Sequence, residues 1–282
     1  MSNLHLALGG LITFLSLTTS VQAASTCELD LNALPDFSGE SFHGNFQQCL
    51  EQSTDGVLHR IVNSLELNFK RREASSGNMQ FVYFYAPDGS VPFSIKEYRN
   101  PTGLYTYFRK GAGDNAETIF SRRQFRDEEG RLTYFRRGKA NSTTVLSERH
   151  FANDHGSYSY WREGYQDDSK SFFTMRSFTE GGATYHYYRL SPKDESTFLS
   201  VKIRPTKKGL HTVYRQGFGN RARPILSVFG DKYRSGEGLR LTRSQASALL
   251  ERRFWGPLLR RSLEQMNQHL KPALADFPTV SN

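Results

Sequence analysis

The sequence predicts a mainly β protein: an antiparallel meander of β-hairpin repeats with about 12 strands, curled or closed, with α-helices at its N- and C-terminal ends. Three observations predict this fold. Similar segments recur with a period of about 26 residues, residue types alternate with period two within them, and turn-forming residues separate their halves.

The second strand of each predicted hairpin ends in an arginine. Five segments align in this way: Gly103–Arg109, Gly130–Arg136, Gly156–Arg162, Ala183–Arg189 and Gly209–Arg215. Successive arginines are 27, 26, 27 and 26 residues apart, and each one follows an aromatic residue. So regular a spacing indicates that one structural unit is repeated.

The first strand of each hairpin carries a hydroxyl residue, then a cation two positions later. The segments are Ser94-x-Lys96-x-Tyr98, Ser121-x-Arg123-x-Phe125, Ser147-x-Arg149-x-Phe151, Thr174-x-Arg176-x-Phe178 and Ser200-x-Lys202-x-Arg204. Asn or Asp opens and Gly closes the intervening turns Asn100–Gly103, Asp127–Gly130 and Asn153–Gly156. Asn and Asp favour type I turns, and glycine supplies the positive φ that ends them.

A weaker sixth copy precedes these five. Its predicted strands are Leu65–Glu73 and Asn78–Tyr85, with a turn at Ala74–Gly77. Twelve short strands are more than a twisted open sheet usually carries, so we expect the sheet to curl strongly or to close.

The repeats resemble those of known hairpin families. The stretch Phe125–Thr133, FRDEEGRLT, is similar to a YD-repeat unit, and the glycine- and aromatic-rich pattern also resembles MORN repeats. The resemblance covers the repeats alone, and the period here is longer than either family normally has. It implies a scaffold or binding role and transfers no catalytic residue.

Both flanks of the repeats read as helical. Asp55 is positioned to cap a helix with an apolar stripe of Val57, Leu58, Ile61, Val62 and Leu65. Near the other end, Thr242-x-x-Gln245 is a capping box before Ala246, Leu249, Leu250 and Phe254. Gly256-Pro257 is expected to break or kink this helix before a second stripe of Leu258, Leu259, Leu263, Met266 and Leu270.

The first 23 residues have the pattern of a signal peptide. An apolar run from Leu6 to Leu17 leads to Val21-Gln22-Ala23, which has small residues where a signal peptidase reads them. We therefore expect cleavage after Ala23 and a periplasmic or secreted protein. No later stretch is apolar for long enough to predict a transmembrane segment in the mature chain.

The two cysteines follow the expected cleavage site closely. In an oxidising compartment, Cys27 and Cys49 are expected to form one disulfide. The predicted organisation is a signal peptide at 1–23, a disulfide-bearing N-terminal segment with a helix at 24–64, a β-hairpin repeat domain at 65–217 and a C-terminal helical cap at 218–282.

Charge is distributed unevenly along the chain. The net charge is +9, and residues 94–217 alone hold 22 basic and 14 acidic residues, a balance of +8. Residues 24–93 hold 4 basic and 9 acidic residues. An acidic head on a basic body indicates either a polyanion-binding surface or a head that neutralises the body internally.

Candidate ligand-binding residues lie in the second strands. Because neighbouring side chains in a strand face opposite ways, the aromatic row before each arginine is predicted as core, beside Thr106, Thr133, Ser159 and Thr212. The other face would present two rows, Arg109, Arg136, Arg162, Arg189 and Arg215 with Tyr107, Tyr134, Tyr160 and Tyr187. Guanidinium groups match phosphate, sulfate and carboxylate, and tyrosine rings offer stacking surfaces.

A plainer interpretation of the arginine row stays open. The repeat would then duplicate a solvated arginine, partly paired with Glu97, Glu148 or Glu163, whose stem covers an aromatic ring. Whether Lys96, Arg123, Arg149, Arg176 and Lys202 share the arginine face depends on the hairpin register, because a bulged turn would reverse one strand.

Other chemistry has weaker support in the sequence. His150, Asp154 and His155 span a turn rather than one face, which favours surface variation over a metal site. The sequence contains no phosphate loop, no zinc-protease motif and no serine-hydrolase elbow, so we assign no catalytic residue, metal ligand or cofactor.

These features predict an exported, non-enzymatic protein that presents a basic and aromatic β surface to an anionic envelope polysaccharide, another anionic polymer or a glycolipid. One alternative is a protein-interaction module, such as an exported immunity or assembly factor with an acidic protein partner. Another is a carbohydrate-active enzyme that uses loop carboxylates. Export argues against nucleic acid as the natural ligand.

Overall fold

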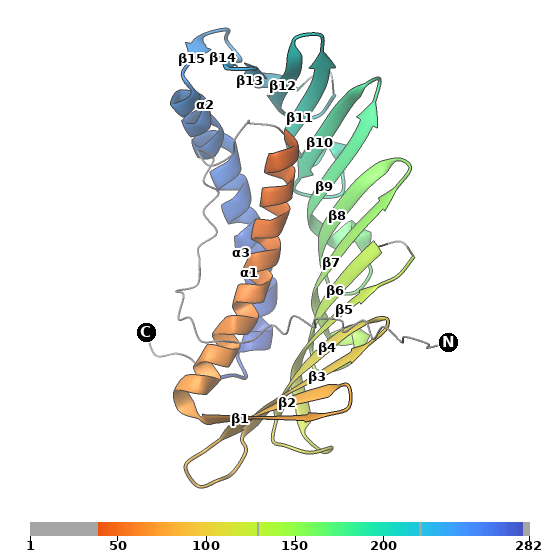
Figure 1. Ribbon diagram of the computed structural model, residues 1–282, viewed down its shortest axis with the longest axis vertical. Coiled ribbons are helices and arrows are strands. Elements are labelled where there is room, and N and C mark those ends of the chain that lie inside the picture. Colours follow the sequence, from red (N-terminus) through yellow and green to blue (C-terminus); the bar gives the residue numbers. More distant parts are fainter. Residues whose placement is uncertain (1–38, 129, 220–221, 279–282) are drawn as a thin grey trace, which may run out of the picture.

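The computed structural model describes residues 39–128, 130–219 and 222–278. Its strands form one 15-stranded antiparallel sheet in which every strand pairs with the next in sequence. The predicted hairpin-repeat meander is therefore confirmed, and the sheet is curled rather than closed. At both ends it bends toward two helices that run side by side along one face (Figure 1).

The helices and strands follow the repeat. The elements up to the third hairpin are α1 (Gly39–Asn68), β1 (Lys70–Ser76), β2 (Met79–Tyr85), β3 (Phe93–Asn100), β4 (Gly103–Lys110), β5 (Glu117–Arg126) and β6 (Gly130–Arg137). The remaining repeats are β7 (Thr144–Asn153), β8 (Gly156–Glu163), β9 (Ser171–Glu180), β10 (Ala183–Arg189), β11 (Thr197–Thr206) and β12 (Gly209–Gln216). After them come β13 (Arg223–Phe229), β14 (Lys232–Ser235), β15 (Arg240–Leu241), α2 (Arg243–Leu250), η5 (Glu251–Trp255) and α3 (Gly256–Leu274).

A β-bulge recurs wherever one of the five hairpins meets the next strand. Phe108 pairs with Phe120 while Arg109 pairs with Thr118, which leaves Ile119 as the extra residue. The equivalent extra residues are Val145, Phe172, Phe198 and Ile225. A bulge bends its strand and increases the local twist, so five of them in series explain why the sheet curls.

The inner face of the sheet, which the helices cover, forms the core. The aromatic row predicted as core is confirmed, because Phe108, Phe135, Trp161, Tyr188 and Tyr214 are each at most 2% exposed. These rings pack against apolar side chains of α1 and α3 in two adjoining clusters. Burial of this size is the largest favourable contribution to folding, at ~1.5–3 kcal/mol per large apolar side chain.

Helix α1 begins earlier than the sequence predicted. Its expected stripe from Val57 to Leu65 is buried, but Asp55 lies inside the helix rather than at its start. Phe46, Cys49 and Leu50 extend the same stripe toward the N-terminus with helical spacing and reach the core. The helix also ends later, since residues 65–68 are helical and the first strand starts only at Lys70.

The C-terminal region begins with strands rather than with the predicted helices. β13, β14 and β15 extend the sheet before Thr242 and Gln245 form the expected capping box of α2. At Gly256-Pro257 the helix neither breaks nor ends, but widens into one π-helical turn in which the Gly256 N–H donates to the Glu251 carbonyl. A Cβ at Gly256 would lie 2.9 Å from that oxygen, which explains the glycine.

The hairpin turns are confirmed in position, and their Asn and Asp side chains act as expected. Asn100 Oδ1 accepts from the N–H groups of Thr102 and Gly103, and Asp127 Oδ1 accepts from the N–H of Gly130. Gly130 and Gly156 have the expected positive φ, whereas Gly103 does not. A Cβ at Gly103 would stand 2.2 Å from the Gln124 carbonyl oxygen, so the next strand approaches too closely for any other residue.

Two predictions fall at the N-terminal end. The signal peptide lies outside the described residues, as does Cys27, so cleavage after Ala23 and the Cys27–Cys49 disulfide stay predictions. Cys49 itself belongs to α1 and is buried on the side of the helix that faces the core. Among the described helices, none combines the length and apolarity needed to cross a bilayer.

Candidate binding surface

Two sets of cations share the outer face, which is the face of the sheet opposite the helices. Arg123 pairs directly with Tyr134, Arg149 with Tyr160, and Arg176 with Tyr187. Directly opposed residues point to the same side of a sheet, so the register left open by the sequence places both sets on one face. We call Arg109, Arg136, Arg162, Arg189 and Arg215 the loop row, and Lys96, Arg123, Arg149, Arg176 and Lys202 the turn row.

The loop row is not an open ladder of guanidinium groups. Arg109, Arg136, Arg162 and Arg189 are 1–7% exposed, and each reaches into the loop that follows its own strand. Arg109 donates to the Gly113 carbonyl at 3.1 Å and Arg136 to the Lys139 carbonyl at 3.2 Å. Arg162 and Arg189 form ion pairs with the loop residues Asp168 and Asp194. These partners replace Glu97, Glu148 and Glu163, which the strand alternation places on the inner face.

Burial changes the acid–base behaviour of three arginines of this row. Desolvation lowers the pKa of Arg109, Arg136 and Arg189 from the usual arginine value. Arg215, the last of the row, is half-buried. The loop row therefore fastens loops to the sheet, a role that the repeat pattern did not reveal.

The loops are fastened at a second point by the hydroxyl residue of each first strand. Ser94, Ser121, Ser147 and Ser200 each donate to the carbonyl of a glycine 17 residues later: Gly111, Gly138, Gly164 and Gly217. In the remaining repeat, Thr174 and Ser191 take these positions at 3.5 Å. The sequence signal was an Arg-x-Gly at the end of four of the second strands. These hydrogen bonds explain why a hydroxyl residue recurs in each first strand.

The same loops cover the predicted tyrosine row. Tyr165 packs on Tyr134 with ring centroids 4.8 Å apart, and Phe218 packs on Tyr187 at 5.1 Å. Tyr134 is fully buried and Tyr187 is 8% exposed. Burial raises the pKa of Tyr107, Tyr134, Tyr160 and Tyr187. Of the predicted ligand-binding residues, most are thus closed off by the loops.

The turn row is half-buried, in contrast to the four buried arginines of the loop row, and lies on aromatic rings. Arg123 stands over Tyr105 and Phe125, with its guanidinium carbon 5.2 and 4.5 Å from the ring centroids. Arg176 stands over Tyr158 and Phe178 at 5.3 and 4.5 Å. Arg149 lies over Phe151, Lys202 over Tyr185 and Lys96 over Phe81. Every repeat therefore presents a cation on an aromatic platform.

The turn row has few acidic neighbours. Within the described strands, register and alternation place one acidic residue on the outer face, Glu180 at the end of a hairpin. In the described parts of the chain, neither Arg123 nor Arg176 forms an ion pair with a carboxylate. Although burial acts in the opposite direction, hydrogen bonding with Thr102 and the charge of Arg123 lower the pKa of Tyr105. The outer face thus combines positive charge with flat rings.

Titratable groups also gather on the inner face, beneath α1. Glu148 is 3% exposed, and burial followed by the charge of Glu51 raises its pKa to about 8. His150 lies beside Ser159, Gln47 and Glu51, and burial lowers its pKa to about 4. His150 is therefore packed under a helix, which corrects the interpretation of this position as surface variation. The described residues contain no group of three or more His, Cys, Asp or Glu that could hold a metal ion.

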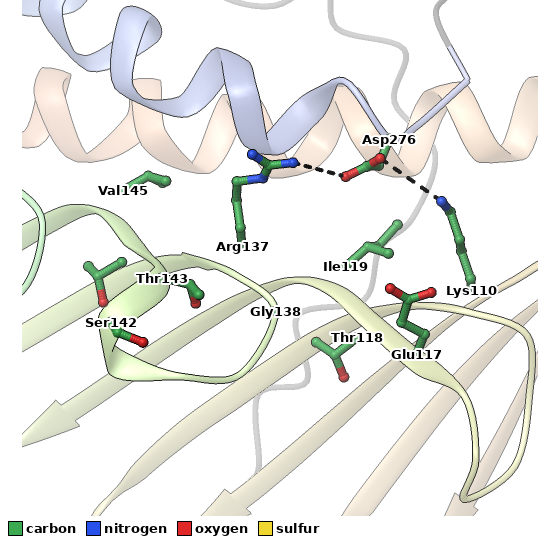
Figure 2. Close-up of a pocket in the computed structure, with 11 residues that line it drawn as sticks. Lys110, Glu117, Thr118, Ile119, Arg137, Gly138, Ser142, Thr143, Val145 and Asp276 are labelled. Atoms are coloured by element: carbon green, nitrogen blue, oxygen red, sulfur yellow. Dashed lines mark ion pairs between the residues drawn. The ribbon is translucent and has the colours of Figure 1, made fainter.

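A hollow of about 520 Å³ lies where the loops approach the end of α3. Figure 2 shows Lys110 and Arg137 pointing toward Asp276 from the sheet, with Ser142, Thr143 and Glu117 around them. The side-chain nitrogens of both cations stand 3.9–4.0 Å from the Asp276 carboxylate, and all three side chains are at least 36% exposed. Such wide, solvated pairs join the loop edge to the helix weakly.

No protein-family model, curated protein or solved structure matches this chain. The similarity to YD and MORN repeats accordingly stays a resemblance in the repeat sequence.

Proposed function

We propose that this chain is an exported, non-enzymatic binding protein whose outer face holds an anionic polymer or glycolipid of the cell envelope. The observation that carries the proposal is the turn row, a set of half-buried cations on aromatic platforms, on a face where the described strands place one acidic residue, Glu180. The loop row, which the sequence favoured, contributes by holding the loops that border this surface.

Physical chemistry supports an anionic ligand with flat or ring-shaped units. Stacking on aromatic faces holds the arginine side chains in place, so less conformational entropy is lost when they bind phosphate, sulfate or carboxylate. A sugar ring laid beside Tyr105, Tyr158 or Tyr185 would bury apolar surface while the neighbouring cation met its charge. The signal-peptide pattern supports an envelope location.

The test compares two triple variants that lose the same charge. Arg123→Gln with Arg149→Gln and Arg176→Gln removes the centre of the turn row, whereas Arg253→Gln with Arg260→Gln and Arg261→Gln removes exposed arginines from the helical layer. At about fivefold per contact, the first variant should bind lipopolysaccharide or a polyuronate roughly 100-fold more weakly, and the second should bind within about twofold of wild type.

Salt dependence provides the second measurement. Each lost contact should reduce the slope of log affinity against log salt by roughly 0.7–1. Equal losses in both variants would mean that net charge alone drives binding and would remove the turn row as the site. Absence of polymer binding by a folded wild-type protein, with capture of one acidic protein, would favour the protein-interaction alternative.

A further inference from the structure

The register of the strands makes the turn row run obliquely across the sheet. Tyr134 faces Arg123 on one side and Ser147 on the other, and Arg149 lies two residues beyond Ser147. Successive cations are therefore two strands apart, about 9.6 Å, and displaced along the strand by about 6.8 Å, so their backbones are about 12 Å apart. The row advances by the same step at every hairpin.

The loops between the repeats prevent a long ligand from extending along the strands of the outer face. Tyr165 and Phe218 cover the tyrosines beside the row, and Asp168 and Asp194 place negative charge on the loop side. A long anionic ligand laid along a strand would meet this barrier after a few residues. Across the strands, from Lys96 to Lys202, cations and rings follow one another along the open half of the sheet.

The curvature of the sheet favours a flexible anionic chain over a flat anionic membrane surface as the ligand. Neighbouring strands twist by roughly 20–25° relative to one another, so a row that crosses β3 to β11 winds around a curved surface. A flat membrane surface would meet one or two of its cations at a time. A flexible chain could follow all of them.

Resting on the proposed function, we infer that the ligand is a linear anionic polysaccharide whose chain crosses the strands obliquely, with one cation of the turn row contacting it in each hairpin. Lys96, Arg123, Arg149, Arg176 and Lys202 are then five successive subsites for one chain. The rings beside them stack on its sugar units.

The test uses oligogalacturonates of defined length, measured by calorimetry, with single substitutions at the centre and ends of the row. An oligomer that spans three subsites must include the central one in every placement. Arg149→Gln should therefore weaken it by about fivefold, whereas Lys96→Gln or Lys202→Gln leaves two of three placements intact and should weaken it by about 1.4-fold. An oligomer that spans all five subsites should lose a similar factor with each of the three variants.

Other outcomes overturn this inference in recognisable ways. If each hairpin binds separately, every substitution lowers the stoichiometry while affinity stays constant and independent of length. If vesicles carrying anionic glycolipid bind while soluble oligomers of every length do not, the ligand is a membrane headgroup. Equal affinity for polyphosphate of matched charge would show that sugar stacking contributes nothing. In all three cases the proposal of an anionic ligand survives. If none of these probes bound to the protein, both that proposal and the inference of five subsites would be rejected.

Discussion

The outer face carries two rows of cations that the sequence made almost indistinguishable, and the structure treats them in opposite ways. Arg162, in the loop row, is 1% exposed and held by Asp168. Arg176, in the turn row of the next strand, is half-buried and lies on two aromatic rings. Both recur every 26 or 27 residues. A charged residue that recurs in every repeat therefore has a role in the repeat, but its recurrence does not show whether that role is structural or functional.

The chain segment that follows each cation determines whether its side chain is buried or partly exposed. The loop row precedes loops that fold back over the sheet, so its guanidinium groups are enclosed and must be satisfied by carbonyls or carboxylates. The turn row precedes tight hairpin turns, which add no chain above the sheet. An aromatic neighbour then holds the cation without enclosing it.

The largest expected effect concerns the stability of the loop row. Replacing Arg136, Arg162 and Arg189 together with Gln should lower the free energy of unfolding by roughly 3–6 kcal/mol, about 1–2 kcal/mol per site, because each loop loses a buried partner. Urea unfolding followed by tryptophan fluorescence measures this, since Trp161 and Trp255 lie in the core.

The matched control is the triple Gln variant of Arg123, Arg149 and Arg176. It should lose less than about 1 kcal/mol per site, the usual size of a cation–π contact at a partly exposed position. If the two triple variants were equally destabilised, the contrast between the rows would fail.

The next prediction concerns a buried carboxyl group on the inner face, Glu148, whose enclosure by other segments also determines its electrostatics. The pKa of Glu148 is raised to about 8, against about 4.3 in an unfolded chain, so folding favours its protonated form. Its stabilising contribution is complete below about pH 4.3 and is lost as pH rises toward 8, by up to ~1.4 kcal/mol per unit.

Glu148→Gln should abolish this dependence between about pH 7 and 8, a window above both the unfolded value of His150, about 6.5, and its folded pKa of about 4. Unfolding free energies of wild type and variant at several pH values measure it. The variant should become the more stable protein as pH rises; parallel curves would show that Glu148 stays ionised in the folded state.

The smallest effect concerns the hydroxyl contacts beneath the loops. Ser147→Ala removes the hydrogen bond to the Gly164 carbonyl and should cost about 1 kcal/mol. Ser157→Ala is the control, because Ser157 lies in the adjacent strand and its hydroxyl makes no hydrogen bond within the described part of the chain. Hydrogen exchange in residues 163–170 should accelerate in the first variant and remain unchanged in the second.

Local patterns in the sequence predicted the strands, the turns and the core face of this protein. Period-two alternation identified the strands, Asx side chains and glycine marked the turns, and aromatic residues beside Thr or Ser marked the core face, since each of these depends on residues close together in sequence. The capping box at Thr242 was readable for the same reason. The start of α1 was misjudged because Asp55 resembles a cap, although the stripe continues upstream through Leu50 and Phe46.

Features that depend on contacts between distant segments required the tertiary structure. The three additional strands β13–β15 carry no copy of the repeat and form because β12 offers them an edge. The extra residues at Ile119 and Val145 are apolar like their neighbours, so the bulges, the curl and the oblique course of the turn row became apparent only once strands were paired. Likewise, the sequence established that arginine recurs at 136 and 162, but the exposure of a side chain depends on which segments fold over it. The loops between the repeats bury four arginines of the loop row, which the sequence alone did not indicate.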